Sequence, residues 1–235
     1  MERTRKRRFI GDSLVDNSCI NQYLKQTQKI YGDKLYLKIN KASINNSSEE
    51  ILDKFYHSIN NCKKCQLGNS RNNFVFGVGD KNADLLLVGE APGEREDLEG
   101  VPFVGRAGKL LDKILAAISL SRDKGVYICN VLKCRPPDNR DPLLSEIEQC
   151  EPYLKEQINL IKPKLIVALG RVAAKTLLKN DLALKDMRLI KHDYYGTPLV
   201  ATYHPAALLR NQNLKPAAWE DFKWIRNLIN YKNGK

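Results

Sequence analysis

Four short apolar segments constrain the fold of this chain more than any other feature of its sequence. Each lacks the polar alternation of a half-exposed strand, so each is typical of a strand buried on both faces of a sheet. They span residues 84–88, 126–132, 165–169 and 199–202. Helices are expected between and after them, at residues 107–119, from 142 onward, at 172–178 and at about 216–231. This alternation predicts an α/β fold with a four-stranded parallel sheet covered by helices on both faces.

Capping residues and prolines place the ends of two helices. The serines at 47–48 precede two acidic residues and predict a helix that ends at about Ile59, because a hydroxyl caps free amides and acids favour the first turn. In the helix after the second strand, Asp141 is expected to cap and Pro142 to fit the first turn. Pro152 should break or kink that helix.

The positive charge of the chain is concentrated near its start. The formal net charge is +12, from 39 basic and 27 acidic residues. Residues 1–48 hold ten Lys/Arg against four Asp/Glu, and they predict a mobile basic arm with one weak helix near 18–31, ahead of a folded domain at 49–235. Such an excess attracts polyanions, nucleic acid first among them, although a solvated basic surface has the same composition.

The sequence also indicates the compartment. No apolar run approaches the roughly 18 residues that a membrane-spanning helix needs, and the basic start is not followed by the apolar stretch of a secretion signal. We therefore expect a cytoplasmic protein with no membrane association. In that compartment, the six cysteines favour metal ligands or buried thiols over disulfides.

Four of the cysteines are spaced so that the fold can bring them together. Cys62 and Cys65 form a C-x-x-C pair, Cys134 follows a predicted strand and Cys150 lies on the next predicted helix. Four thiolates suit tetrahedral zinc or an iron–sulfur cluster, and spacing alone does not choose between them. A redox pair with two core thiols is the alternative. Cys19 in the arm and Cys129 within a strand are not expected to be ligands.

The predicted strands end in loops that could form a site, because open α/β sheets bind ligands at the carboxyl ends of their strands. The first loop reads GEAPG at 89–93, and an ordinary turn would have a similar composition. Asn130 ends the second strand, where its amide could read a base edge or cap a loop. His204 follows the fourth strand and could donate to a developing anion, although a lone histidine is more often structural. Basic residues at 136–140 could contact phosphates.

Taken together, these segments resemble the family 4 uracil-DNA glycosylases, the iron–sulfur branch of that superfamily. The resemblance covers about residues 55–230, and its segments occur in the family's order. They are the C-x-x-C at 62–65, GEAPGEREDLEGVPFVGRAG at 89–108, NVLKCRPPDNR at 130–140, Cys150, and YHPAALLR at 203–210. The basic arm at 1–48 lies outside the resemblance.

The resemblance implies a three-layer α/β/α domain with a central four-stranded parallel sheet. It implies a four-iron four-sulfur cluster (4Fe-4S) held by Cys62, Cys65, Cys134 and Cys150. The activity implied is that of a monofunctional hydrolase in base excision repair, which releases uracil from DNA and leaves an abasic site. The partner implied is uracil-containing DNA, reached in the cytoplasm at the nucleoid, and we expect a monomer.

The resemblance also implies roles for single residues. Phe103 matches the position whose ring stacks on the extruded base. Asn130 would accept from uracil N3–H and donate to O4, a pattern that cytosine inverts. Glu96 would lie against C5, where a thymine methyl would clash. His204 and the backbone N–H groups of residues 89–91 would meet the negative charge that develops on uracil O2.

The loop itself supplies further candidate substrate-binding residues, which are Gly89, Ala91, Pro92 and Gly93. Better-known relatives carry a water-orienting aspartate where this chain has Ala91, and family 4 members also lack it. The resemblance therefore leaves Glu90 or Asn139 as the residue that positions water.

Two other functions remain open at the level of sequence. One is a non-enzymatic DNA-binding or uracil-sensing module on the same fold, which loss of Asn130 or His204 would have favoured. The other is a relative that crosslinks to the abasic site, a behaviour that goes with an inserted basic loop bearing a histidine. Here that loop reads CRPPDNRDPL and has neither feature.

Overall fold

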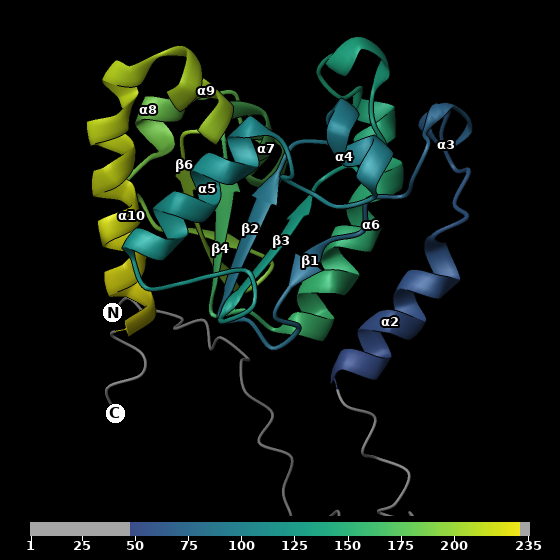
Figure 1. Ribbon diagram of the computed structural model, residues 1–235, viewed down its shortest axis with the longest axis horizontal. Helices are drawn as coiled ribbons and strands as arrows, with labels where there is room; N and C mark the ends of the chain where they lie inside the picture. The colour runs from purple at the N-terminus through teal and green to yellow at the C-terminus, as the bar shows by residue number, and fades with distance from the viewer. Residues whose placement is uncertain (1–47, 231–235) are drawn as a thin grey trace, which may run out of the picture. The chain divides into compact units, whose positions relative to one another are not determined.

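A six-stranded sheet forms the centre of the computed structural model, which describes residues 48–230. The strand order is β1-β3-β2-β4-β6-β5. The four central strands are parallel and the two edge strands are antiparallel to their neighbours. The parallel strands are β2 (Leu85–Gly89), β3 (Val126–Asn130), β4 (Leu165–Leu169) and β6 (Thr197–Thr202). They are the four strands that the sequence predicts, and their carboxyl ends meet at one edge of the sheet (Figure 1).

The two edge strands are absent from the sequence prediction, which gave four strands and not six. β1 (Val78–Gly79) and β5 (His192–Tyr194) are only two and three residues long. Strands of that length carry no readable alternation, and they form because the neighbouring strand offers free backbone groups. The central four-stranded parallel sheet is as predicted, and the two short strands extend it at its edges.

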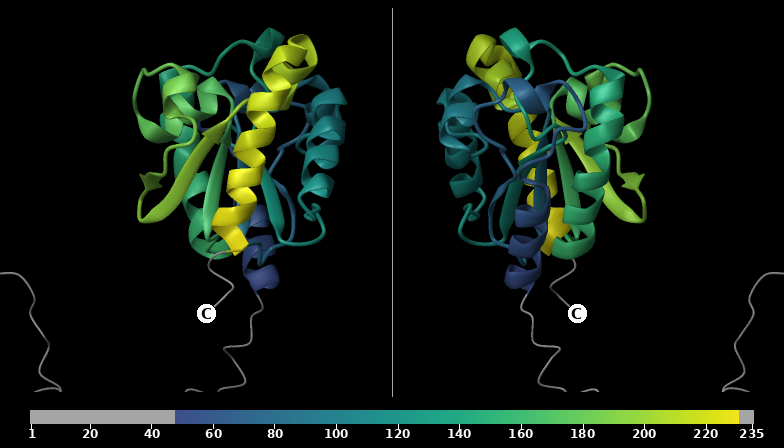
Figure 2. Two further views of the ribbon diagram at one scale, coloured as in Figure 1. Left: turned by 90° about the vertical axis from the view of Figure 1, so that its left-hand side faces the viewer. Right: turned by 90° about the vertical axis from the view of Figure 1, so that its right-hand side faces the viewer.

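Helices cover both faces of the sheet, as the sequence predicts (Figures 1 and 2). On one face, Leu85 and Leu87 of β2 pack with α5 (Arg106–Ala117) and α10 (Lys215–Asn230). On the other face, Leu86 and Val88 belong to the core that contains residues of three helices. These are α2 (Ser48–Ile59), α6 (Leu144–Ile161) and α7 (Arg171–Leu178).

Helix α6 departs from the prediction at two points. It begins at Leu144, because Glu146 turns back and accepts a hydrogen bond from the Leu143 amide at 2.9 Å, so Asp141 is not its cap. It also runs through Pro152 without a break. Pro152 is exposed, so water can hydrate the carbonyl group that the proline leaves without a partner.

Short helices occupy the connections. They are α3 (Leu67–Ser70), α4 (Glu94–Glu99), α8 (Leu184–Met187) and α9 (Pro205–Arg210), with 3₁₀ turns η3 (Pro137–Asn139) and η4 (Gln212–Leu214). Elements α4, η3 and α9 follow the carboxyl ends of β2, β3 and β6. No helix in the span 48–230 has both the length and the apolar character to cross a membrane. The expected arm at 1–48 and its weak helix lie outside the described residues, except for Ser48.

Candidate functional site

A pocket of about 430 Å³ opens at the carboxyl ends of the parallel strands. Three loops that are far apart in the sequence contribute its predicted residues. These are Glu90, Ala91, Pro92 and Gly93 after β2, Asn139 after β3, and His204 after β6. The fold therefore brings these six candidate residues together. Asp141, Arg171 and Arg210 also line the pocket, and the sequence analysis did not assign them to it.

Gly89 joins the pocket loop to two further candidates beside it. A Cβ atom at this position would lie 2.3 Å from the Asn130 side-chain oxygen and 2.8 Å from the Phe103 ring. Any side chain here would displace one of these two groups. The residue is glycine because the amide and the ring both approach its backbone.

The side-chain amide of Asn130 is placed for a ligand. Asn130 ends β3 and is only 2% exposed. Its backbone oxygen accepts from Lys133, but its side-chain amide makes no hydrogen bond to any residue within 48–230. Within residues 48–230, Asn60 Oδ1 is the one fully buried side-chain polar atom without a partner. The two polar atoms of the Asn130 amide therefore keep contact with solvent and are open to a ligand.

His204 is held in one protonation state. Its Nδ1 atom accepts a hydrogen bond from the Ala206 amide at 3.1 Å, at the start of α9. Because an amide can only donate, Nδ1 carries no proton, and the neutral ring carries its proton on Nε2. Burial, reinforced by Arg210 and opposed by Glu96, lowers the pKa of His204 to about 4. The side chain is therefore a neutral hydrogen-bond donor at physiological pH.

Phe103 lies in a loop whose backbone is held by Arg122, a residue outside the loop. Its backbone adopts a left-handed conformation with φ of 56°. Arg122 donates to the carbonyl oxygens of Pro102 and Phe103 at 2.8 and 2.5 Å. The Phe103 ring lies 5.4 Å from the His204 ring, with an angle of 32° between the planes. The loop thus delivers an aromatic face next to the histidine.

Glu96 makes contacts that the sequence did not indicate. One carboxylate oxygen accepts from the amides of Val104 and Gly105, each at 3.1 Å. The carboxylate therefore joins α4 to the loop that carries Phe103. This contact is compatible with the predicted position against the base, which stays a prediction.

Glu90 has the chemistry of a group that exchanges protons near neutral pH. Burial, aided by the negative charge of Asp141 and opposed by Arg171, raises the pKa of Glu90 to about 7. Asp141 and Arg171 lie 3.7 Å apart as an ion pair. The sequence assigned Asp141 to a helix cap, and its place beside Glu90 becomes visible only when the loops after β3 and β4 are brought together.

Asn139 lies on the exposed side of the pocket. Its side-chain oxygen accepts from Nε of Arg135 at 2.9 Å. Arg140, one of the basic residues expected near phosphates, pairs through both terminal nitrogens with Glu146 at 2.9 and 2.6 Å.

The four cysteines singled out by their spacing line one narrow pocket. Cys62 and Cys65 lie between α2 and α3, Cys134 follows β3, and Cys150 lies on α6. Within residues 48–230, no three His, Cys, Asp or Glu side chains come close enough to bind a single metal ion. The ligands of one zinc ion all lie about 2.3 Å from it, whereas each thiolate of a cubane cluster binds a different iron, which spaces the sulfurs more widely. Cys129 is buried in β3 and does not line this pocket.

Hydrogen-bond donors surround the cysteine sulfurs. Arg71 donates to Cys134 at 3.1 Å, Tyr153 to Cys62 at 3.2 Å, and the Lys133 amide to Cys150 at 3.4 Å. Arg71 also donates to the backbone oxygen of Cys62 at 2.7 Å, so it ties the C-x-x-C loop to Cys134. Donors of this kind stabilise thiolates and tune the groups that thiolates hold.

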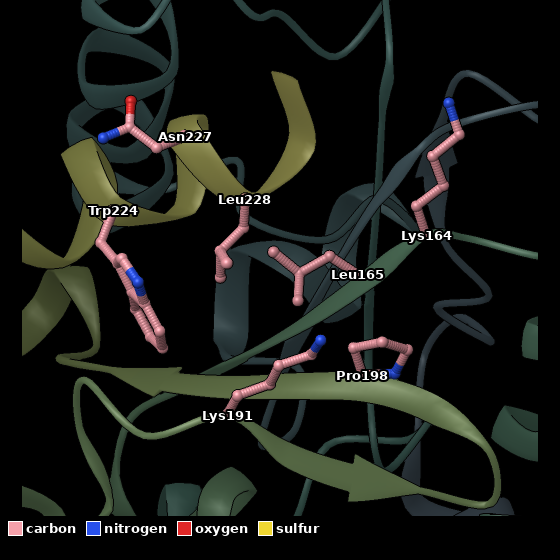
Figure 3. Close-up of a pocket in the computed structure, with 7 residues that line it drawn as sticks. All are labelled: Lys164, Leu165, Lys191, Pro198, Trp224, Asn227 and Leu228. Atoms are coloured by element: carbon pink, nitrogen blue, oxygen red, sulfur yellow. The ribbon is translucent and has the colours of Figure 1, made fainter. Parts of the chain in front are cut away.

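A separate hollow of about 250 Å³ lies near the opposite ends of the strands. Figure 3 shows Trp224 and Leu228 of α10 directed toward the strand that carries Leu165. The residues that line it include none of the predicted site residues. It is therefore not part of the candidate site.

Comparisons with known proteins bear on this arrangement. The family model described as the uracil DNA glycosylase superfamily matches residues 76–223. A type-4 uracil-DNA glycosylase of Archaeoglobus fulgidus is 45% identical over 191 residues, covering 78% of this chain and 96% of that protein. A type-4 uracil-DNA glycosylase of Sulfurisphaera tokodaii is 47% identical, and the match covers 76% of this chain and 85% of that protein. A type-4 uracil-DNA glycosylase of Thermotoga maritima is 38% identical, and the match covers 77% of this chain and 96% of that protein.

The match to the family model spans both the pocket loops and the parallel strands that position them. The matches to the type-4 proteins extend over about three quarters of the chain and most of each relative. This chain therefore belongs to the uracil DNA glycosylase superfamily, in its type-4 branch.

Proposed function

We propose that this protein excises uracil from DNA by hydrolysis of the N-glycosidic bond and leaves an abasic site. The observation that carries the proposal is the Asn130 amide, which is nearly buried and lacks a hydrogen-bond partner within residues 48–230. Chemistry on a base within a duplex requires that the nucleotide be turned out of the stack into a pocket. The pocket at the strand ends, with an amide and an aromatic ring beside it, is suited to receive it.

Asn130 reads the base in this mechanism. Its side-chain oxygen accepts from uracil N3–H and its nitrogen donates to O4. Cytosine presents an acceptor at N3 and a donor at its exocyclic amine, so the same amide orientation meets two mismatched groups. Phe103 stacks on the base, and Glu96 lies against C5, where the methyl group of thymine would clash.

His204 stabilises the leaving group. As the glycosidic bond breaks, negative charge develops on uracil O2, and a donor aimed at that oxygen lowers the barrier. The hydrogen bond from Ala206 to Nδ1 leaves the proton on Nε2, and the lowered pKa keeps the ring neutral. A neutral imidazole donates without leaving an uncompensated charge buried beside the base. Backbone N–H groups of residues 89–91 add to this stabilisation.

Glu90 positions and deprotonates the attacking water. Its raised pKa places it near neutrality, which suits a group that must accept a proton at physiological pH. Asn139 lines the same pocket but is exposed and bonded to Arg135, so we assign the water to Glu90. Ala91 forms part of the apolar wall beside it.

Cys62, Cys65, Cys134 and Cys150 hold a 4Fe-4S cluster in this proposal. The donor set fits, because the four thiols line one pocket and hydrogen-bond donors reach three of the four sulfurs. When bound, the cluster supplies a covalent brace for the segment that leads from β3 toward the DNA-facing loops. Arg71, Tyr153 and Lys133 would stabilise the anionic sulfurs.

The experiment is excision of uracil from a labelled oligonucleotide. Protein purified without oxygen should release uracil from U·G and U·A duplexes, and alkali should then break the strand at the abasic site. Matched C·G and T·A duplexes are the controls. Tight binding of uracil DNA without release would instead support the uracil-sensing module, and a covalent protein–DNA product would support the crosslinking relative. Elemental analysis of the same sample should find about four irons per chain.

A further inference from the structure

Lys133 carries a charge into the core of the domain. Its side chain is 0% exposed and lies in the segment between Asn130 and Cys134. No carboxylate within residues 48–230 forms an ion pair with it. Burying an ammonium group without an anion is strongly unfavourable, so a buried lysine with this environment requires a compensating interaction.

Two oxygen atoms hold the ammonium group in place. Nζ donates to the backbone oxygen of Asn130 at 2.7 Å and to Oε1 of Gln157 at 2.5 Å. Gln157 is also fully buried, and its Nε2 donates to the Phe76 carbonyl at 3.0 Å. That second bond fixes which end of the Gln157 amide faces the lysine. The ammonium group is thus oriented, and it fixes the peptide group of Asn130 in turn.

The cysteine pocket lies on the other side of the same residue. The Lys133 backbone amide donates to the Cys150 sulfur at 3.4 Å, and the next residue along the chain is Cys134. When the Cys150 thiol is deprotonated to act as a ligand, its negative charge is stabilised by the buried cation, whereas Arg71 is the cation beside Cys134. The opposite charges then compensate each other in a region of low dielectric constant.

We propose that Lys133 is a positioning residue that links the four-cysteine pocket to the end of β3 that reads the base. Its charge balances the ligand thiolate of Cys150, and its hydrogen bond fixes the peptide from which the Asn130 amide projects. The inference rests on the proposed function of that amide and of the cysteines. It gives Lys133 two measurable effects, one on metal retention and one on excision.

Lys133→Met tests both effects, because methionine preserves the length of the side chain and removes its charge and donors. Leu132→Ala is the matched control, since Leu132 is the neighbouring residue, is also buried, and carries no charge. Three quantities are measured for each protein: the rate of iron loss to a chelator, the single-turnover rate of uracil excision, and the affinity for uracil-free DNA.

The expected result is that Lys133→Met loses iron several-fold faster than wild type. Its excision rate should fall by roughly 10- to 100-fold, the factor expected if the free energy of one hydrogen bond from a charged group no longer holds Asn130 in its reactive position. Its affinity for uracil-free DNA should not change, because Lys133 is 0% exposed and so contacts no phosphate itself. Leu132→Ala should retain iron and excision within a few-fold of wild type. Wild-type values for Lys133→Met, or equal losses in Leu132→Ala, would overturn the inference.

Lys133→Gln covers the case in which Lys133→Met does not fold. Its amide keeps a donor near the Asn130 carbonyl but has no charge, so iron should be lost faster than from wild type. Wild-type iron retention in this variant contradicts the inference. Wild-type protein that excises uracil but holds no iron also overturns it, whereas wild-type protein that excises no uracil overturns the proposed function itself.

Discussion

His204 shows how one hydrogen bond can determine the chemistry of a side chain. The Ala206 amide occupies Nδ1, and burial lowers the pKa of the ring to about 4. The ring is therefore neutral over the whole physiological range and has one free donor. None of this can be predicted from the letters YHPAA, because both effects depend on how the chain turns into α9 and on what covers the ring.

Replacing His204 tests its role. His204→Ala should lower the single-turnover rate of uracil excision by about 100- to 1000-fold, because one donor to a developing anion is lost. Its affinity for DNA should be nearly unchanged. His57→Ala is the matched control, since His57 is exposed on α2 and does not line the pocket. A His204→Ala rate near that of the control would exclude the role.

The pKa of Glu90 makes a prediction about pH. Glu90 must be ionised to accept a proton, so the excision rate should rise with pH, with a midpoint at about 7. Asp141 raises this pKa and Arg171 lowers it. Asp141→Asn should therefore move the midpoint to lower pH, and Arg171→Gln should move it to higher pH. Rate profiles of the three proteins check the signs, and coincident midpoints would remove Glu90 as the base.

At the residue level, the sequence predicted which residues belong to the site better than it predicted the contacts that they make. The residue types at Asn130, His204 and the four cysteines carried enough chemistry to be selected from their motifs. Asp141 and Lys133 were not selected, because their importance comes from neighbours that are distant in sequence or from burial. Glu96 was selected, but its bonds to the amides of the Phe103 loop depend on tertiary approach.

At the level of elements, the buried strands were the most predictable part. An uninterrupted apolar run such as β4 indicates a buried parallel strand when such runs alternate with helices along the chain. The edge strands β1 and β5 could not be predicted, because pairing with a neighbour defines them rather than any pattern of their own. Helix α6 shows the converse case, in which tertiary packing of a long apolar face overrides the local effect of Pro152.

Pro152 provides a test of that interpretation. If packing holds α6 together despite the proline, Pro152→Ala should stabilise the protein by about 1–3 kcal/mol, because a backbone hydrogen bond is restored and a steric conflict is removed. Pro142→Ala is the control, since Pro142 precedes the helix. Denaturation by urea, followed by circular dichroism, measures both variants. An unchanged or lower stability of Pro152→Ala would mean that the proline fits the helix without cost.

At the scale of the molecule, segments of the chain connect the cysteine pocket to the pocket at the carboxyl ends of the parallel strands. Arg71 connects the C-x-x-C loop to Cys134, and the next residue, Asn72, bonds to buried Asp97 on α4 at 3.0 Å. Helix α4 begins directly after the loop 89–93. The two pockets have no lining residue in common. They are connected through these bonded segments, so a cluster at the cysteines, as proposed above, would brace the loop at the strand ends through them.

The most direct test of this account compares wild type with Asn130→Ala on two duplexes that differ only in uracil or cytosine opposite guanine. Single-turnover excision is measured at saturating enzyme, and DNA affinity is measured in parallel. The account predicts rapid release of uracil and none of cytosine by wild type. For Asn130→Ala it predicts a uracil rate lower by about 100- to 1000-fold, weaker discrimination against cytosine, and unchanged DNA affinity. A wild-type rate and full discrimination in Asn130→Ala would contradict it.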